Sequence, residues 1–584
     1  MKTIIIILMS LFFASTLCYS QLTPDYPFKT YLDENNNLYI TGSNYNDQTN
    51  SIDLWTAKYS NGNRIWRAFF NSPIGIDRGL DLAVDVQGNV VATGYVFNSA
   101  TSSNDIILLS YNSNGIYQWH RIISNSGDDK GMGLDITIDG LGRINEIFIS
   151  GYITNTASGK DFFTAKYSSI GDLIWQRTYD ENNVDNVATD IHLDLGYAYV
   201  SGYTREKDYT TNDFMLLSYW KENGDLSDSI IYNKPGSNEL PAQFIISNKS
   251  EVPVQKSKSS VICVTDNLPG TGRSSNYLTL FFDEDINHDL QVRWANLFSN
   301  GPGAYVNVPT SIASDLKGNI YVTGYCNNFN NSFQSNGLDF ATIKYAGENG
   351  KYAWKDKVKF FNYNDTSTTG VDDKASSVRS NNIGDLFVAG SCQGSPYGFS
   401  FAKYKGISSR FPTREYSRPF VPSFIADNNN GINLNKGTKL EIASDGSPLL
   451  IVMGWNENYS YWAAQKFTIN GEVEYTIDPN QIGDNDYIKS MKTTAKVKLE
   501  NSPNPFNPST VISFNLTKTD KRNFVQLIVF DMLGREVQTL VNDFKDAGSN
   551  KAVFNAAGLS SGIYYYTLIV DGISAVTKSM VLVK

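Results

Sequence analysis

Short stretches in which apolar and polar residues alternate fill most of the chain, and bends rich in glycine and asparagine separate them. One well-defined set reads GLDLAVD (79–85), VVATGY (90–95), DIILLSYN (105–112) and YQWHRII (117–123). A period of two residues is typical of β-strands with one buried face, and Gly and Asn accept the positive φ of tight hairpin turns. This set therefore predicts four antiparallel strands joined by hairpins.

The same four-strand pattern recurs along the chain. Each copy has an apolar strand that ends in glycine, a second strand similar to DFFTAKY, and in most copies a tryptophan after the next turn. The glycines are Gly42, Gly94, Gly151, Gly202, Gly324, Gly390 and Gly454, and the tryptophans are Trp66, Trp119, Trp175, Trp294 and Trp354. The glycines lie 51 to 66 residues apart except for one interval of 122, which predicts a degenerate unit around SSVICVTD (259–266). The sequence therefore contains eight units.

Repeated four-stranded antiparallel units predict an all-β protein, and specifically a β-propeller, because a ring of blades leaves only short, protected sheet edges. The units resemble the bacterial β-propeller repeats of the SBBP family over residues 27–478. That family is usually associated with seven blades. We therefore predict an eight-bladed propeller over residues 21–480, with seven blades and an irregular terminal unit as the alternative, followed by a linker at residues 481–496.

The last ninety or so residues differ from the repeats. They contain PNPFNP (503–508), VFDMLGREV (529–537) and GLSSGIYYY (558–566), in that order, and end at Lys584. Residues 497–584 resemble the type A C-terminal sorting domain of the type IX secretion system. Their alternating segments, separated by Gly-rich turns, predict a small immunoglobulin-like β-sandwich.

Proline fixes φ and lacks a backbone donor, so the sorting motif should be a stiff, extended segment that enters the sandwich. Its residues are Pro503, Asn504, Pro505, Phe506, Asn507 and Pro508. Phe506 would be an apolar anchor for a transport receptor, or it would plug one end of the sandwich. The resemblance implies the type IX secretion machinery as a partner, and a protein that is secreted or attached to the outer cell surface.

The first twenty residues have the order of a secretory signal peptide. Lys2 precedes an apolar stretch at residues 4–14, and CYSQ predicts cleavage after Ser20. The apolar stretch is too short for a stable transmembrane helix, and we predict no other membrane span. Cys18 offers a lipoprotein alternative, although Ser15 stands where a lipobox needs an aliphatic residue.

Charge and cysteine content narrow the possible partners. The net charge is −10, with no block of Lys or Arg, so binding to nucleic acid is not expected. Cys263, Cys326 and Cys392 lack any metal-ligand spacing. They are expected to act as small apolar core residues, with one disulfide pair as an open alternative.

One segment has oxygen ligands at the spacing of a calcium loop. Asp283, Asp285, Asn287 and Asp289 occupy alternate positions. However, His288 replaces the glycine of such loops, and no glutamate stands at the twelfth position. The segment also fits a simple turn between two strands of the fifth unit. We therefore expect no cofactor, with Ca²⁺ as the one candidate.

Acidic residues recur in the first strand of several units, four positions before an aspartate in the following turn. They are Asp81, Asp135, Asp190 and Glu441, and Lys29 and Ser311 take this place in two other units. If the first strand is innermost, four carboxylates would face the central channel and attract a cation or a cationic ligand. The alternative is structural, with each acid bonded to a backbone amide or a hydroxyl between adjacent blades.

The sequence contains no pair of histidines at ligand spacing and no nucleotide-binding loop. We therefore predict an exported, non-catalytic propeller that binds a glycan, a polymer or a surface protein outside the cell. The first alternative is an extracellular polysaccharide hydrolase or lyase that uses the channel carboxylates. The second is a purely structural surface protein.

Overall fold

A computed structural model of the chain gives the fold. It describes residues 26–46, 51–70, 75–156, 159–194, 196–205, 211–233, 237–247, 259–267, 275–284, 289–300, 306–329, 335–354, 358–361, 372–392, 398–405, 413–420, 438–455, 460–477, 499–516, 523–531, 536–546, 548–570 and 573–584. The predicted signal peptide and linker lie outside these residues. None of the described segments forms a helix, so none offers a helical membrane span.

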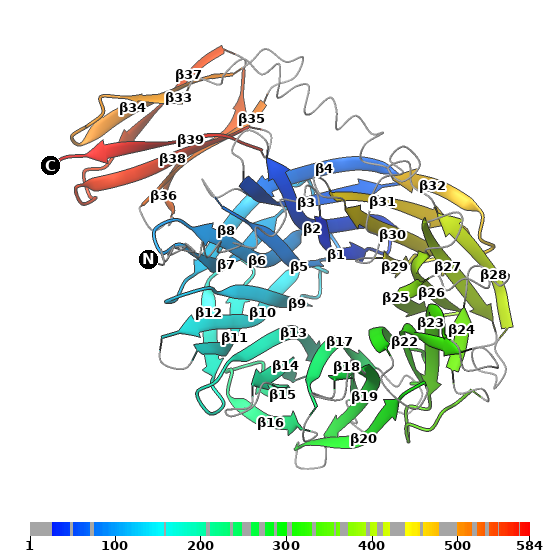
Figure 1. The fold of residues 1–584 in the computed structure, drawn as a ribbon. Coiled ribbons are helices and arrows are strands. Elements are labelled where there is room, and N and C mark those ends of the chain that lie inside the picture. The colour runs from blue at the N-terminus through cyan, green and yellow to red at the C-terminus, as the bar shows by residue number, and fades with distance from the viewer. Residues whose placement is uncertain are drawn as a thin grey trace, which may run out of the picture.

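Eight four-stranded antiparallel sheets follow one another in the described part of the chain and form a ring (Figure 1). The first four contain β1 (Tyr26–Leu32), β2 (Asn37–Asn46), β3 (Ser51–Ser60), β4 (Asn63–Phe70); β5 (Arg78–Val84), β6 (Val90–Asn98), β7 (Ser103–Tyr111), β8 (Tyr117–Ile123); β9 (Lys130–Ile138), β10 (Ile144–Asn155), β11 (Gly159–Ser168), β12 (Leu173–Tyr179); and β13 (Asn186–Asp194), β14 (Tyr197–Arg205), β15 (Asn212–Trp220), β16 (Leu226–Tyr232). The other four contain β17 (Glu239–Ser247), β18 (Ser259–Asn267), β19 (Ser275–Glu284), β20 (Leu290–Phe298); β21 (Asn307–Ser314), β22 (Ile320–Phe329), β23 (Ser335–Tyr345), β24 (Val358–Phe361); β25 (Asp373–Ser380), β26 (Leu386–Cys392), β27 (Gly398–Lys405), β28 (Thr413–Phe420); and β29 (Thr438–Ile442), β30 (Pro448–Trp455), β31 (Ser460–Phe467), β32 (Val473–Ile477). The predicted unit of four hairpin-connected strands is confirmed.

The first strand of each sheet lies toward the centre of the ring and the fourth lies at its outer edge (Figure 1). First strands of neighbouring sheets approach one another around the ring, and β1 also meets β29. Side chains on these strands therefore form the wall of a central channel.

The ring closes through side chains, because every sheet is built from one continuous segment of chain. The first and last sheets share a buried apolar cluster in which Trp55 and Trp462 stack with ring centroids 6.3 Å apart. Thr30 Oγ1 also donates a hydrogen bond of 2.7 Å to Glu441 Oε1 across this seam. The closing contact is therefore made by side-chain packing and side-chain hydrogen bonding.

Four of the recurrent tryptophans hold their sheet to the next one at the outer edge. Trp66 Nε1 in β4 donates to Ser113 O, 3.0 Å away in the turn between β7 and β8. Gly115 in that turn has φ 76°, and a Cβ there would lie 2.5 Å from the Trp66 ring. Both the backbone conformation and the close approach require glycine. Equivalent pairs are Trp119 with Gly171, Trp175 with Gly224, and Trp294 with Gly350.

The recurrent turn aspartates organise the hairpin between the first and second strands. Asp85 Oδ1 accepts hydrogen bonds from the backbone N–H groups of Gln87 and Asn89, at 2.9 and 2.8 Å, and Asp85 Oδ2 accepts one from Asn89 Nδ2. Such Asx turns satisfy the backbone donors of the bend. Asp85 Oδ2 also accepts Ile144 N of the third sheet, and Asn89 Oδ1 accepts Ser113 N, so these two residues serve both the local turn and longer-range contacts.

The predicted alignment of the eighth unit is wrong by two residues. In the hairpin of the eighth unit, Ala443 takes the position that Asp85 has in the second unit. The N–H of Ala443 donates to Ser447 O, as the N–H of Asp85 donates to Asn89 O. Val452 consequently takes the place of the repeat glycine, and Gly454 does not. The described β29–β30 pairing lacks the bulge that the other units have, so a glycine for close backbone approach is not required there.

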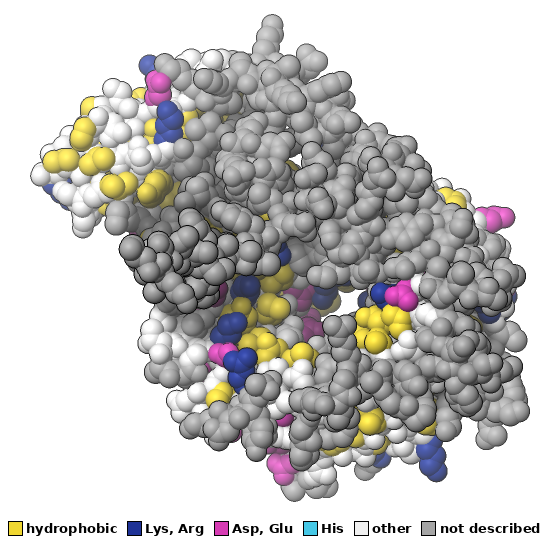
Figure 2. Space-filling view, viewed as in Figure 1, with side chains coloured by type: hydrophobic (Ala, Val, Ile, Leu, Met, Phe, Trp, Pro, Cys, Tyr) yellow, Lys and Arg dark blue, Asp and Glu magenta, His cyan; other side chains and the backbone are white. Residues whose placement is uncertain are grey.

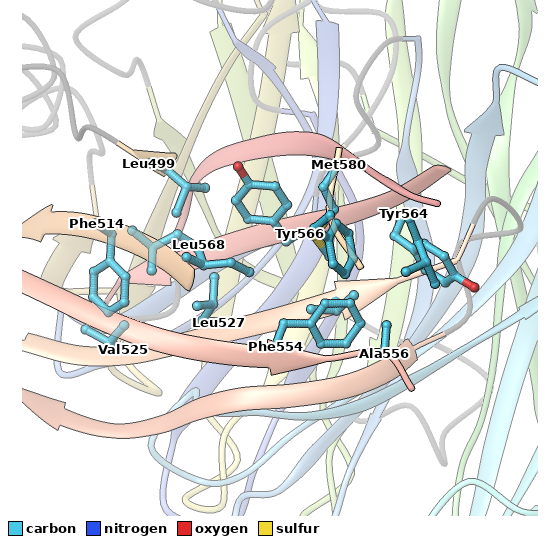
Figure 3. Close-up of a cluster of buried hydrophobic side chains, with 14 of the residues drawn as sticks. Leu499, Phe514, Val525, Leu527, Phe554, Ala556, Tyr564, Tyr566, Leu568 and Met580 are labelled. Atoms are coloured by element: carbon cyan, nitrogen blue, oxygen red, sulfur yellow. The ribbon is translucent and has the colours of Figure 1, made fainter. Parts of the chain in front are cut away.

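Two further antiparallel sheets form the C-terminal unit. One contains β33 (Leu499–Ser502), β34 (Ser509–Leu516) and β37 (Gly548–Asn555), and the other contains β36 (Glu536–Lys545), β35 (Asn523–Phe530), β38 (Gly562–Val570) and β39 (Ile573–Leu582). Buried side chains from both sheets, including Phe514, Leu527, Phe554 and Tyr566, form its core (Figure 3).

Cys326 and Cys392 are both free thiols buried in the ring, in two different apolar clusters. Burial raises the pKa of Cys326 to about 12 and also raises that of Cys392. A disulfide between these two is therefore not formed. The side chain of Cys263 lies outside the described residues.

Candidate functional site

The channel wall is the candidate site, and one position on it can be compared in all eight sheets. We define the wall position as the first-strand residue that pairs with Thr93 in the second sheet or with its equivalent in the others. Its occupants are Lys29, Asp81, Gly133, Asp190, Gln243, Ser311, Ser377 and Lys439. Neighbouring sheets carry the same residue there in two places, namely serine in the sixth and seventh sheets and lysine in the eighth and first.

At four sheets the wall residue holds the next sheet in place. Its oxygen accepts the backbone N–H of the residue that follows the wall position in the next sheet. The four bonds are Asp81 Oδ2 from Leu134 N (2.9 Å), Gln243 Oε1 from Ile312 N (3.0 Å), Ser311 Oγ from Val378 N (3.2 Å) and Ser377 Oγ from Leu440 N (3.1 Å). These bonds are the inner counterpart of the tryptophan contacts at the outer edge.

Lys29 and Lys439 occupy the same position but cannot accept such a bond, because an ammonium group has no lone pair. Lys29 Nζ instead forms an ion pair of 2.8 Å with Asp81 Oδ1, and its side chain is 39% exposed. Burial lowers the pKa of Lys29, but the carboxylates of Asp81 and Asp190 raise it overall. Lys29 is therefore cationic.

Lys439 has a different electrostatic environment on the neighbouring strand. Burial and the adjacent Lys29 charge lower the pKa of Lys439 to about 8, although the Glu441 carboxylate opposes this shift. Arg379, two residues beyond the wall position of the seventh sheet, adds to the same effect. Three cationic side chains thus converge on one sector of the wall.

The four predicted acids are on first strands, but only two of them hold the wall position. Asp81 and Asp190 do so. Asp135 and Glu441 lie two residues beyond the wall position of their strands. In the third sheet the hairpin is longer, and in the eighth sheet the predicted alignment is wrong by two residues. A shift of two residues keeps the side chain on the same face of the strand, so both still face the channel.

The Asp135 carboxylate is hydrogen-bonded to the backbone, since its Oδ2 accepts the N–H of Leu193 in the next sheet at 2.9 Å. Its pKa is raised by burial, against the effect of His192. Glu441 accepts Thr30 Oγ1 of the first sheet. Three of the four acids therefore bond a group of the adjacent sheet, as the structural alternative describes.

Asp190 is different because it faces a histidine that the sequence did not single out as a site residue. His192 Nε2 lies 3.5 Å from Asp190 Oδ2 and 3.0 Å from Phe244 O, and His192 Nδ1 lies 4.0 Å from Asp135 Oδ2. Burial would lower the pKa of His192, but these two carboxylates raise it overall. Burial likewise raises the pKa of Asp190, and His192 lowers it to below its usual value.

The wall is consequently divided into charged and uncharged sectors. Cations lie on the seventh, eighth and first sheets, together with Glu441 of the eighth. The other carboxylates and His192 lie on the second to fourth sheets, and neutral Gln243 and Ser311 lie on the fifth and sixth. Figure 2 shows Lys or Arg and Asp or Glu side chains inside the hollow at the middle of one face. The arrangement combines a fixed polar lining with local excess of one charge.

The predicted calcium loop is only partly within the described residues. Asp285 and Asn287 lie outside them. Asp283 is 9% exposed and forms an ion pair with Arg293, and Asp289 is exposed at the start of the strand that follows. Within the described part of the chain, no group of three or more His, Cys, Asp or Glu side chains is placed to hold a metal ion.

The sorting motif is folded against the C-terminal unit. Phe506 is 2% exposed in its core, Phe506 N donates to Val581 O, and Val583 N donates to Phe506 O. Asn504 Oδ1 accepts Val581 N at 2.8 Å. In contrast, the side chains of Pro503, Asn504, Pro505, Asn507 and Pro508 are exposed. Phe506 therefore fills the core, and its polar and proline neighbours form the accessible part of the motif.

Comparison with protein families gives two matches. Residues 502–583 match the secretion system C-terminal sorting domain, and residues 294–331 match the β-propeller repeat. The comparison with curated proteins gave no match.

Solved structures with a related arrangement have low similarity. They include a polysaccharide lyase described as an ulvan lyase (7% identity, TM-score 0.39, covering 80% of this chain and 98% of that one) and the β-propeller domain of the trilobed protease from Pyrococcus furiosus (9% identity, TM-score 0.33, covering 66% and 92%). A eukaryotic initiation factor is a third (7% identity, TM-score 0.36, covering 78% and 90%). Similarities this distant do not bear on function.

The chain thus carries a β-propeller repeat and a type IX secretion C-terminal sorting domain. The sorting domain marks it as a protein that is secreted or attached to the outer cell surface, and implies contact with the secretion machinery.

Proposed function

We propose that this protein is an exported, eight-bladed β-propeller that binds an extracellular ligand, a glycan or other polymer, in its central channel without catalysing a reaction. The proposed propeller spans residues 21–480, a linker spans 481–496, and an immunoglobulin-like sorting sandwich spans 497–584. The eight consecutive four-stranded sheets and the side-chain seam between the first and the last support the blade count.

The observation that carries the binding proposal is the state of the channel carboxylates. Asp81 and Asp135 each accept two backbone N–H bonds, and Glu441 accepts a hydroxyl. A glycosidase needs one carboxyl group poised as an acid and a second as a base or nucleophile. Carboxylates held by the backbone suit a rigid, preorganised binding surface better than proton transfer.

The test combines a glycan array with an activity assay on the full exported chain. We expect retention of at least one polymer and no new reducing ends or unsaturated sugars after prolonged incubation. Depolymerisation of the retained polymer, lost on Asp190→Asn or His192→Gln substitution, would establish the enzymatic alternative. An absence of binding to glycans and to outer-surface extracts would favour a purely structural protein.

Export is tested separately by removing residues 497–584. The shortened protein should accumulate in the periplasm while its ring still folds, because the sorting domain has its own core. Immunoblots of the cell fractions give the answer. Arrival of the shortened protein at the surface in normal amounts would contradict the assigned role of this domain.

A further inference from the structure

We propose that the Lys29–Lys439 sector of the channel wall is a subsite for an anionic group, and that the ligand is an acidic polysaccharide carrying sulfate or uronate groups. The inference rests on the proposed function and names the chemical class of the ligand. It starts from a difference between equivalent residues of one repeat.

In several sheets the residue at the wall position holds the next sheet in place by accepting a backbone hydrogen bond. Ser377 Oγ and Gln243 Oε1 each hold the backbone of the next sheet, and a hydroxyl or amide is enough for this. Lysine cannot do the same, since it only donates hydrogen bonds. The first and eighth sheets thus lack the backbone bond that the wall residue accepts in those sheets, and Lys29 instead pairs with Asp81 of the next sheet.

Placing two ammonium groups side by side also has an electrostatic cost. Lys29 and Lys439 stand at the same register on neighbouring strands, β1 and β29, which are in contact. Arg379 on β25 is close enough to influence Lys439 as well. Like charges at this spacing repel one another, and burial strengthens the repulsion.

The nearby acids balance this charge only in part. Asp81 pairs with Lys29 but also holds Leu134 N and Leu82 N, and Glu441 accepts Thr30. Asp190 also acts on Lys29, but it is paired with His192. The three cations of the sector therefore face three carboxylates, each of which is also engaged by another group. An incoming anion would relieve the repulsion between the lysines and make charge-assisted hydrogen bonds with them.

Partial exposure makes the sector accessible. Lys29 is 39% exposed, and Lys439 and Arg379 are neither fully buried nor fully exposed. The protein as a whole carries a net charge of −10, so general attraction to polyanions is absent. Any affinity for an acidic polymer should then depend on this local group of cations. On this reasoning a free phosphate or a lone sulfate ion would bind weakly, since repeated anionic groups are needed to gain avidity.

The experiment measures binding of the full exported chain to dextran, dextran sulfate and polygalacturonate by calorimetry. Dextran is the uncharged control polymer. Dextran sulfate carries sulfate groups and polygalacturonate carries carboxylate groups, so the two together show which anionic group is bound. We expect binding to at least one acidic polymer and none to dextran. The Lys29→Met/Lys439→Met double variant should bind about 100-fold more weakly, from about tenfold for each charge-assisted contact.

Two control variants keep the result interpretable. Lys317→Met/Lys351→Met removes two charges from exposed lysines in turns of the sixth sheet and should leave affinity unchanged. Lys29→Arg/Lys439→Arg retains both charges and should preserve most of the affinity, which also guards against a folding defect. Equal affinity of the Met variant and the unchanged protein would overturn the anionic subsite.

The outcomes also separate this inference from the proposed function. Binding to dextran or to other neutral glycans alone would refute the acidic ligand while leaving a glycan-binding propeller. Loss of affinity in the turn-lysine control as large as in the wall variant would show non-specific charge attraction and would also refute the subsite. Failure to bind any glycan or surface extract would remove the proposed function itself.

Discussion

The outer edge of the ring and the wall of its channel come from the same repeat. Equivalent positions hold the same type of residue at the outer edge but different types at the wall. At the outer edge a tryptophan packs on a turn glycine of the next sheet, and Trp66, Trp119, Trp175 and Trp294 repeat this contact with little change. At the wall, the equivalent residue is a lysine, an acid, an amide, a serine or glycine. The residues that recur hold sheets together in the same way each time, whereas the wall position varies between residues that accept a backbone bond and lysines that introduce charge.

The strongest test of the outer edge is Trp66→Ala. Loss of a buried tryptophan should lower the free energy of unfolding by about 3–5 kcal/mol, because the packing on Gly115 and the bond to Ser113 both disappear. Denaturant unfolding of the full chain measures this. Trp220, which is 40% exposed, provides the matched control, and its alanine variant should lose about 1 kcal/mol. Similar losses in both variants would contradict the structural role of the outer contact.

A second test removes a structural residue from the wall. Ser377→Ala leaves Leu440 N without its acceptor and should cost about 1–3 kcal/mol of stability. Affinity for acidic polymers should stay unchanged, since Ser377 is assigned to structure. Ser169→Ala, at an exposed turn, should alter neither property. A Ser377→Ala variant that is stable but has lost binding would reverse the assignment.

A third test uses pH to examine the environment of Lys439. The pKa of Lys439 in the folded protein is lowered to about 8, below that of an unfolded lysine at about 10.4, so between these values the unfolded chain binds more protons. Stability should therefore rise with pH across this window, by up to about 3 kcal/mol before solvent screening is considered. Affinity for acidic polymer should fall over the same window as the ammonium charge is lost.

The Lys439→Met variant is the control for this pH dependence. It should show a smaller increase in stability between about pH 8 and 10.4, because the group with the lowered pKa has been removed. Thermal unfolding followed across this range is sufficient. A pH profile identical to that of the unchanged protein would mean that Lys439 does not have the assigned environment.

Much of the fold could be predicted because its residues act locally. The alternation within 79–85 and 90–95 and the turn chemistry around Asp85 both depend on neighbouring residues, and the strands and hairpin formed as expected. The eighth unit was misaligned because Val452 takes the glycine place in a strand pair without a bulge. A pattern search that follows glycine cannot detect this.

The candidate site could be predicted only in outline. Asp81 and Asp190 were assigned to the wall from their distance to the turn, and the structure places both there. Lys439 and His192 were missed as wall residues, because their significance depends on the register of β29 and on contacts between sheets. The alternation of side chains along β13 was the available signal for His192, since it stands two residues after Asp190.

A structure of the full chain with a bound sulfated or uronate oligosaccharide tests the central claim most directly. An anionic group of the sugar should lie within hydrogen-bond distance of Lys29 Nζ and Lys439 Nζ, with Ser377 and Gln243 still bonded to their neighbouring sheets. A sugar bound at the outer edge of the ring, with both wall lysines untouched, would contradict it.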